Sequence, residues 1–147
     1  MAMVESPMHA AFAEAQLAYE AGEVPVGAVV VGGGRIIGRG HNLIETLADP
    51  TAHAEMLAIT AATNYLGGKF LDQCALYVTL EPCPMCAGAI LWARVGELHY
   101  GAPDPRRGYT RYSPSMLHPS TRVYTGDMAA ECARLMRSFF RARREKW

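Results

Sequence analysis

Two short segments of the sequence carry side chains that bind metals and move protons. The first is Thr51-Ala52-His53-Ala54-Glu55, and the second is Glu81-Pro82-Cys83-Pro84-Met85-Cys86. Cys83 and Cys86 are three residues apart, so both sulfurs can reach one point if a helix begins there. The free amides and the positive dipole end of a helix start also favour the thiolate, which is the form that binds zinc. We therefore expect His53, Cys83 and Cys86 to bind one Zn²⁺ per chain.

Three protein ligands leave the fourth position of a tetrahedral zinc ion for water, as in catalytic zinc sites. Zinc lowers the pKa of that water and yields a nucleophilic hydroxide near neutral pH. Glu55 need not bind the metal, so its carboxylate can take the water proton and pass it to a leaving group. In the middle of a helix His53 and Glu55 would face nearly opposite ways. The spacing therefore predicts that the end of the helix itself points at the metal.

The same residues allow other interpretations. Cys83-Pro84-Met85-Cys86 alone is also typical of a thioredoxin-type redox pair, but redox chemistry has no need of the His-x-Glu element. A closed structural zinc would need a fourth ligand, and the remaining histidines do not lie at ligand spacing: His9, His41, His99 and His118. His99 lies in an apolar segment and is interpreted as a packed histidine. Cys74 and Cys132 are interpreted as small buried hydrophobes.

The elements that must position these segments follow from caps, breakers and apolar spacing. Ser6 and Pro7 are typical of a helix start, and Gly22 is typical of a helix end. The pattern predicts helices at about 7–21, 52–66, 82–93 and 127–144, and strands at 24–31, 35–40, 75–80, 97–101 and 122–125. A hairpin followed by alternating strands and helices predicts an α/β fold, a three-layer α/β/α sandwich with a mixed sheet of about five strands. The segment 102–121 is expected to be a long functional loop.

Length and composition fit one soluble domain over residues 1–147. The start of the chain lacks the charged and apolar regions of a secretory signal, and the apolar runs are too short to cross a bilayer. We expect a cytoplasmic protein with no membrane partner. Residues 1–102 hold 4 Lys/Arg and 10 Asp/Glu, whereas residues 103–147 hold 10 and 4. This asymmetry indicates either an anionic partner at the basic end or a solvated helix surface.

His53-Ala54-Glu55 together with Pro82-Cys83-x-x-Cys86 resembles the signature of the cytidine and deoxycytidylate deaminase superfamily. Further segments look like bacterial tRNA-specific adenosine deaminases: Glu23–Val29, Asp49–Glu55, Leu76–Cys83 and Ala130–Arg141. The resemblance implies a cytidine deaminase-like fold, a homodimer, and conversion of adenosine to inosine at the wobble position of a tRNA anticodon. It implies that zinc-bound hydroxide attacks the adenine carbon bearing the amine. Glu55 would protonate the ring nitrogen and then the departing ammonia.

The resemblance also implies which residues meet the substrate. Asn42 matches a loop asparagine that hydrogen-bonds the target base, Asp104 matches a loop residue near the substrate nucleotide, and Ala54 and Pro82 are expected to border the base. By residue type alone, Asn42 and Asp104 are ordinary turn residues.

Basic side chains could approach the phosphates of the tRNA anticodon stem-loop, and a phenylalanine could stack on an unpaired base. The candidates are Arg106, Arg107, Phe140, Arg141, Arg143 and Arg144, with Arg134, Arg137 and Lys146 also on the last helix. Adjacent Phe139 and Phe140 cannot face the same way on a helix, so at least one should lie in the core.

The segment from Pro105 to Pro114 departs from the family pattern. Common members continue with a Lys, a Gly-Ala pair and a Ser-Leu, whereas this segment interleaves arginines with tyrosines, as a nucleic-acid surface or a solvated loop would. A free-base deaminase acting on guanine or cytosine is therefore the alternative, although such relatives often have Gly-Pro-Phe-Gly where this chain has Val24–Gly27. A zinc-stabilised RNA-binding module is the non-enzymatic alternative, which would have no use for Glu55.

Overall fold

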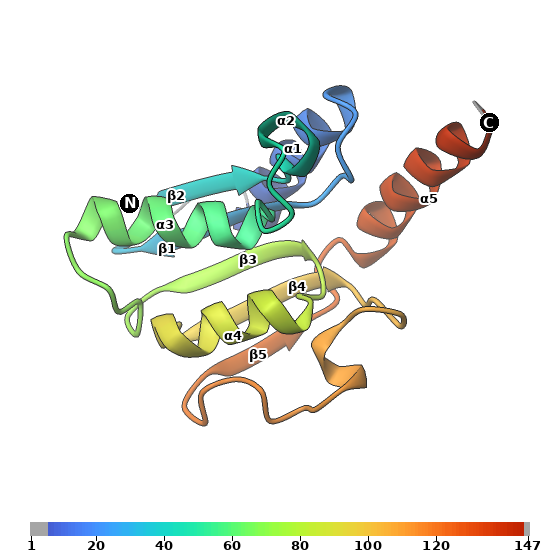
Figure 1. Cartoon of the computed structure of the whole chain (residues 1–147). Coiled ribbons are helices and arrows are strands. Elements are labelled where there is room, and N and C mark those ends of the chain that lie inside the picture. The colour runs from blue at the N-terminus through green and yellow to red at the C-terminus, as the bar shows by residue number, and fades with distance from the viewer. Residues whose placement is uncertain (1–5, 146–147) are drawn as a thin grey trace.

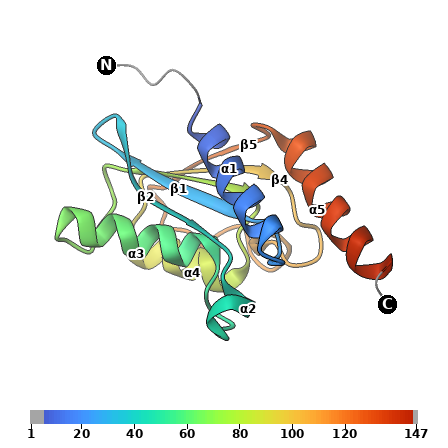
Figure 2. The same cartoon turned by 90° about the horizontal axis from the view of Figure 1, so that it is seen from above.

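A five-stranded sheet lies between two layers of helices in the computed structural model, which describes residues 6–145 (Figures 1 and 2). The elements are α1 (Pro7–Glu20), β1 (Gly27–Gly32), β2 (Arg35–His41), α2 (Ile44–Leu47), α3 (Ala54–Leu66), β3 (Ala75–Leu80), α4 (Pro84–Ala93), β4 (Glu97–Ala102), a 3-10 turn (Tyr109–Arg111), β5 (Arg122–Thr125) and α5 (Ala129–Glu145). Helices α1 and α5 lie on one side of the sheet, and α3 and α4 lie on the other (Figure 2). This is the predicted three-layer sandwich.

The sheet is mixed, with the strand order β2-β1-β3-β4-β5. Strand β1 pairs antiparallel with β2 and β3, whereas β3, β4 and β5 run parallel. A parallel pair needs a crossover connection, and α4 supplies it between β3 and β4. The carboxyl ends of β3 and β4 therefore lie at the edge where α4 begins. Ligands commonly bind at such an edge in α/β folds.

The central strand β3 is buried on both sides. Leu76 and Val78 lie in the main apolar cluster, and Tyr77 packs on the other side against a cluster that contains Met8 and Val29. A strand covered on both faces exchanges little with solvent and moves little. The segment that follows it, which carries Cys83 and Cys86, is thus attached to a strand that is covered on both faces.

Gly40 in β2 lets α3 approach the sheet at backbone distance. A Cβ at this position would lie 2.8 Å from the Leu57 Cβ and 2.9 Å from the Ala54 carbonyl oxygen. Both separations are shorter than van der Waals contact, so a side chain here would push the first turn of α3 outward. Ala54 is the first residue of α3, so Gly40 sets how closely the start of that helix lies to the sheet.

The first strand is shorter than predicted. It was expected from Val24 but begins at Gly27. Pro25 has no amide to donate to a strand ladder, and the Val26 amide donates to the Val24 carbonyl at 2.8 Å. The helices expected from 52, 82 and 127 likewise begin two residues later. None of the helices in residues 6–145 has the length and apolar character needed to cross a membrane.

The short helix α2 was not predicted and interrupts the expected loop before Asp49. The Glu23 carboxylate, 1% exposed, accepts hydrogen bonds from the Glu45 amide at 3.1 Å and the Thr46 amide at 2.7 Å. A contact more than twenty residues away in the sequence therefore supplies the cap that the local sequence lacks.

Candidate metal centre and active site

The three predicted metal ligands meet where α3 and α4 begin. His53 immediately precedes α3, Cys83 immediately precedes α4, and Cys86 lies in the first turn of α4. His53 Nδ1 is 3.7 Å from Cys83 Sγ and 3.5 Å from Cys86 Sγ, and the three ligand atoms lie within 4.8 Å of one another. Ligand atoms at tetrahedral positions on one zinc ion are about 3.3–3.8 Å apart, given bonds of about 2.0–2.3 Å. The spacing fits one ion.

His53 and Glu55 converge because the helix end faces the site. His53 has an extended backbone, with φ −78° and ψ 153°, and Glu55 is already the second residue of α3. The two side chains therefore do not follow helical spacing and can both face the start of α4, as the sequence analysis required. The interaction with Cys83 is the main cause that raises the pKa of His53, and burial opposes the rise.

Glu55 is a buried carboxyl beside these ligands, with 4% of its surface exposed. Burial raises the pKa of Glu55 to about 7, and the nearby Cys83 charge acts in the same direction. Its own backbone amide and the charge of His53 oppose the rise. A carboxyl with a pKa near neutrality can both accept and release a proton under physiological conditions.

The two sulfurs differ strongly in their pKa values. A hydrogen bond from Cys86 is the main cause that lowers the pKa of Cys83 to about 4, and His53 contributes in the same direction. The pKa of Cys86 is raised, because its thiol is held by the Cys83 thiolate and is buried. A divalent cation between the sulfurs would take the place of the shared proton, so metal binding here should release protons.

Within the described residues, no fourth His, Cys, Asp or Glu joins the group of three. His41 Nδ1 is instead paired with Glu14 Oε1 at 2.8 Å. His99 is stacked between Tyr77 and Tyr124, with ring centroids 4.1 Å and 4.7 Å away, as expected for a packed histidine. Three ligands are the number found in catalytic zinc sites, whereas structural sites have four.

All four cysteines are free thiols in the structure. Cys74 and Cys132 are buried away from the site, as their interpretation as small hydrophobes requires. Cys83 and Cys86 both contact His53, an arrangement that a redox pair does not need. The metal-binding interpretation therefore accounts for more of the geometry than the redox one.

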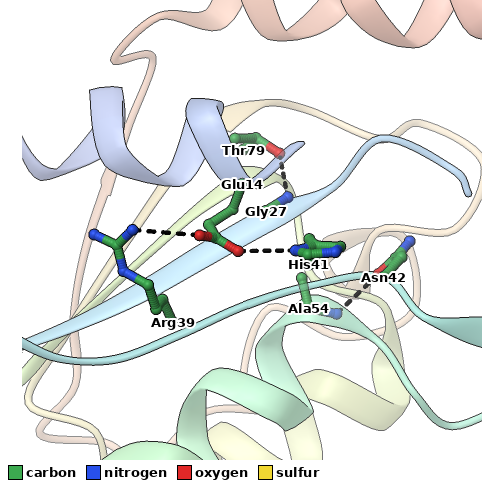
Figure 3. Close-up of polar contacts among 7 residues, drawn as sticks. All are labelled: Glu14, Gly27, Arg39, His41, Asn42, Ala54 and Thr79. Atoms are coloured by element: carbon green, nitrogen blue, oxygen red, sulfur yellow. Dashed lines mark hydrogen bonds and ion pairs between the residues drawn. The ribbon is translucent and has the colours of Figure 1, made fainter. Parts of the chain in front are cut away.

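Asn42 lies between β2 and α2, next to the start of α3. Its Oδ1 accepts a hydrogen bond from the Ala54 amide at 2.8 Å (Figure 3). Asn42 Nδ2 has no hydrogen-bond partner among the described residues. Because every fully buried side-chain nitrogen and oxygen in this part of the chain has a partner, Nδ2 must be accessible to solvent. The amide group therefore uses its acceptor for the protein and keeps its donor free. The proposed contact with the base remains a prediction.

Glu14 of α1 holds the end of β2 that leads to Asn42. One carboxylate oxygen pairs with His41, and the other lies 3.3 Å from Arg39 Nη1 (Figure 3). Glu14 is 7% exposed, so these partners satisfy a carboxylate that burial would otherwise destabilise.

Asp104 organises the loop after β4. Its Oδ1 accepts hydrogen bonds from the Arg106 and Arg107 amides, both at 3.1 Å, and its carbonyl accepts one from the Gly108 amide at 2.8 Å. The Asp104 amide donates to Glu81 Oε1 at 3.1 Å. This is the turn-forming role that the residue type suggests. Contact with a substrate nucleotide stays a prediction for Asp104.

The other two substrate candidates lie beside the metal ligands. Ala54 is completely buried and directly follows His53. Pro82 is also buried and directly precedes Cys83, and its carbonyl accepts a hydrogen bond from the Tyr109 amide at 2.9 Å. Both stay predictions as substrate contacts.

The basic candidates lie in two places. Arg106 and Arg107 are exposed on the loop after β4, and exposed residues of α5 include Arg134, Arg137, Phe140, Arg141 and Arg144. Lys146 lies outside the described residues. Helix α5 reaches away from the sheet toward the C-terminus (Figure 1). These side chains are therefore accessible to a partner, and their contact with RNA stays a prediction.

Arg143 and Phe139 of α5 both contact the body of the protein. Arg143 donates to the Gly22 carbonyl at 2.6 Å and lies 4.8 Å from the centre of the Phe139 ring. Phe139 is buried and Phe140 is exposed, which confirms that only one of this pair faces outward. Arg143 therefore helps to hold α5 against the rest of the chain.

Sequence reasoning missed three buried carboxylates that hold segments around the site: Glu14, Glu23 and Glu81. A glutamate normally indicates a surface position, and its partners here come from distant parts of the chain. Only Glu81 carried a signal, since it stands directly before Pro82 and Cys83 in the motif.

Known proteins resemble this chain over nearly its whole length. The family model for MafB19-like deaminases matches residues 4–144. The tRNA-specific adenosine deaminase of Bacillus subtilis is 44% identical over 151 residues, which cover 99% of this chain and 94% of that protein. The chloroplastic tRNA(adenine(34)) deaminase of Arabidopsis thaliana is also 44% identical, over 92% of this chain but only 12% of that much longer protein.

Solved structures show the same architecture. A structure from studies of A-to-I editing by tRNA:A34 deaminases at the wobble position matches with a TM-score of 0.81 and 44% identity, covering 87% of this chain and 96% of that one. The guanine deaminase of Bacillus subtilis matches with a TM-score of 0.62 and 47% identity, covering 65% of this chain and 62% of that one. The fold is therefore shared by deaminases that act on different substrates.

Proposed function

Because this chain belongs to the MafB19-like deaminases and, among them, to the tRNA-specific adenosine deaminase family, we propose that it converts adenosine to inosine at the wobble position of a tRNA anticodon. Water adds to the adenine carbon that bears the amine, and ammonia leaves, so a carbonyl oxygen replaces the amine. The main support for this proposal is that His53, Cys83 and Cys86 converge beside the buried carboxyl of Glu55.

Zinc is the metal that we propose for this centre, with one ion per chain. Two cysteine sulfurs and one imidazole nitrogen form a donor set that favours zinc over magnesium or calcium. When bound, zinc supplies a Lewis acid that lowers the pKa of water. His53, Cys83 and Cys86 would hold it, and the helix starts that carry them stabilise the thiolates.

Glu55 moves the protons in this proposal. It accepts a proton from the attacking water, delivers it to the ring nitrogen, and protonates the departing amine in the same way. A carboxyl with the ordinary pKa would be a poor proton donor at neutral pH, and burial removes this obstacle by raising the pKa of Glu55 to about 7. Burial also keeps bulk water from intercepting the proton.

The base lies beside the start of α3 in this proposal. Asn42 offers its free Nδ2 to an acceptor on the base while its Oδ1 stays on the Ala54 amide. Ala54 and Pro82 border the base, and Asp104 lies near the substrate nucleotide. These roles are carried over from the family and are supported by where the residues lie.

The anticodon stem-loop contacts the loop after β4 and the last helix. Arg106 and Arg107 approach phosphates from the loop, and Phe140, which is 40% exposed, offers a stacking surface. Arg141, Arg143 and Arg144 add positive charge on α5, within residues 103–147, which hold 10 Lys/Arg against 4 Asp/Glu. A cytoplasmic location is part of the same proposal.

We further propose that two copies associate through α4. This helix, Pro84–Ala93, contains no charged residue, yet its Trp92 is 81% exposed and Met85 is 38% exposed. A helix that is apolar all round is normally buried, and exposed apolar patches commonly mark protein interfaces. A second copy would cover these two side chains.

The alternative substrate is a free base. Similarity to a solved guanine deaminase over 65% of the chain favours it. A zinc-stabilised RNA-binding module is the alternative without catalysis, and a buried, unligated carboxyl beside the metal ligands would have no purpose there.

Ammonia release tests the proposal. Four substrates should be compared: an anticodon stem-loop with wobble adenosine, the same stem-loop with wobble guanosine, free guanine, and free cytosine. Turnover is expected with the first alone. Turnover of a free base but not of the adenosine stem-loop would establish the alternative, and binding of the stem-loop without turnover would indicate the non-catalytic module.

A further inference from the structure

Glu81 is a buried carboxylate whose hydrogen bonds all go to one loop. It is 4% exposed, and each of its oxygens has a partner. Oε1 accepts the Asp104 amide at 3.1 Å. Oε2 accepts the Thr110 amide at 3.1 Å and the Thr110 hydroxyl at 2.7 Å. One side chain therefore holds both ends of the segment 104–110, which we call the recognition loop.

The backbone beside Glu81 is joined to the same loop. The Glu81 amide donates to the Ala102 carbonyl at 2.8 Å, and the Pro82 carbonyl accepts from the Tyr109 amide at 2.9 Å. The segment between β4 and β5 passes the start of α4 (Figure 1). Since Cys83 comes directly after Pro82, the recognition loop is attached to the chain segment that carries a metal ligand.

Gly108 shows how closely the loop approaches this carboxylate. A Cβ at Gly108 would overlap Glu81 Oε2 and would lie 2.6 Å from the Asp104 carbonyl oxygen. A side chain at this position would therefore separate the loop from Glu81. The fit indicates a built contact between the carboxylate and the loop backbone.

The free part of the recognition loop is its basic tip. Arg106 and Arg107 are exposed, and their amides are held by Asp104 Oδ1, which is itself next to the amide bound by Glu81. Between the two anchors the chain has little freedom to move the tip. Removing the anchors would leave three donors without their acceptor and would favour open states of the loop.

We propose that Glu81 is a positioning residue for substrate recognition: it clamps the recognition loop to the metal-binding segment and so presents Arg106 and Arg107 to a polyanionic substrate. The clamp itself does not depend on the proposed function, but the identity of that substrate as RNA rests on it. If only the closed loop binds, the apparent affinity falls in proportion to the closed fraction. Chemistry in the bound complex changes little, because the substrate restores the closed state.

Trypsin tests the clamp without any substrate. In Glu81→Gln the amide group must turn its NH₂ toward the loop donors on one side, so one set of hydrogen bonds is lost at nearly constant shape. Cleavage after Arg106, Arg107 or Arg111 is expected to become at least tenfold faster, because proteolysis follows the population of open states and a tenfold loss of apparent affinity requires the open state to predominate. Cleavage after the arginines of α5 serves as the internal reference. Glu20→Gln, which neutralises an exposed carboxylate on α1, is the matched control and should leave the loop cleavage unchanged.

Steady-state kinetics test the recognition role. For the adenosine stem-loop, Glu81→Gln is expected to raise KM about tenfold with kcat changed less than about threefold, at unchanged zinc content. Thr110→Val removes one donor at an exposed position and should give a smaller shift in the same direction, so the test survives if Glu81→Gln folds poorly. Unchanged loop cleavage overturns the clamp. Faster cleavage with unchanged KM, or a fall in kcat alone, overturns the recognition role. If the wild-type protein does not deaminate the stem-loop, the proposed function is wrong, while the trypsin result still tests the clamp.

Discussion

The Ala54 amide donates a hydrogen bond to Asn42 Oδ1 over 2.8 Å, which joins the end of β2 to the first residue of α3. The first amides of a helix have no partner within the helix, so this bond satisfies one of them. The helix end that it holds also carries His53 and Glu55. A single side chain thus stabilises the start of α3 and reaches solvent beside the metal centre with its other atom.

Two substitutions separate these roles of Asn42. Asn42→Ala leaves the Ala54 amide unpaired and should lower the free energy of unfolding by about 1–3 kcal/mol, together with activity. Asn42→Asp keeps an acceptor for that amide, at a helix end that favours negative charge, so stability should be largely retained while activity is lost. Urea unfolding and deamination of the stem-loop measure the two effects. Full activity in Asn42→Asp would show that Nδ2 is not used.

Removing the carboxyl of Glu55 should abolish turnover and leave the metal in place. Glu55→Gln keeps the shape but cannot accept a proton, and general acid–base catalysis contributes about 10²–10⁴ in rate. Ammonia release and zinc analysis on the same sample give both quantities. Retained deamination would exclude Glu55 as the proton carrier, and loss of zinc would indicate that it is a ligand.

Cys86 should be required for the metal, and Cys74 should not. Cys86→Ser replaces a thiolate by a hydroxyl, a much weaker zinc ligand, so zinc content and activity should both fall. Cys74→Ser changes another buried thiol that lies outside the site and should keep its zinc. Equal zinc loss in both variants would contradict the assignment.

Chelation of zinc from the wild-type protein should lower its unfolding temperature, and added Zn²⁺ should restore it. The reason is that a ligand present at 100–1,000 times its Kd contributes about 3–4 kcal/mol to the free energy of unfolding.

The contribution of Glu23 to the free energy of unfolding should be lost in acid. Burial would raise the pKa of Glu23, but the hydrogen bonds from Thr46 and Glu45 outweigh it and hold the pKa below the usual 4.5. In the folded state Glu23 thus binds fewer protons than in the unfolded state. Its contribution to stability is present above pH 4.5 and is lost as the pH falls through the lower folded-state pKa.

The acid effect can be measured by urea unfolding between pH 7 and the lowest pH at which the protein stays folded. Glu23→Gln should lose less stability on acidification than the wild type, although it is less stable at neutral pH. Glu20→Gln changes an exposed carboxylate on α1 and should follow the wild-type curve. Parallel curves for Glu23→Gln and the wild type would contradict the assignment.

Trp92 should matter for association and not for the folding of one chain. The side chain is 81% exposed, so Trp92→Glu should change the stability of a monomer by less than about 0.5 kcal/mol but place a charge within the proposed interface. Sedimentation should show a dimer for the wild type and a monomer for the variant. Leu17→Glu, at a half-exposed position on α1, is the control and should remain dimeric. A monomeric wild type would refute the proposed dimer.

Sequence reasoning predicted most of the elements and the convergence of His53, Cys83 and Cys86, because the signals for them are local. Cys83 and Cys86 lie three residues apart before an apolar helix, and the spacing of His53 and Glu55 already required the geometry of a helix end. The strand 75–80 and the mixed sheet followed from apolar runs and breakers. Patterns of this kind depend on residues that are close together in the sequence, so they can be recognised in one amino-acid sequence.

The supports of the site could not be predicted in the same way. Glu81 bonds to residues 23 and 29 positions later, and Glu23 caps α2 from 22 and 23 positions earlier. No periodicity or local motif encodes such pairs. Asp104 differs from these two glutamates, because its residue type alone already suggested the turn that it forms with the Arg106 and Arg107 amides.

Gly40 gives the site an unusual sensitivity. It has no side chain and belongs to no catalytic group, yet the absence of its Cβ determines how deeply the start of α3 can settle. Catalytic groups tolerate displacements of only about 0.5 Å. A substitution at Gly40 would therefore shift His53 and Glu55 relative to the two sulfurs, although it alters no ligand.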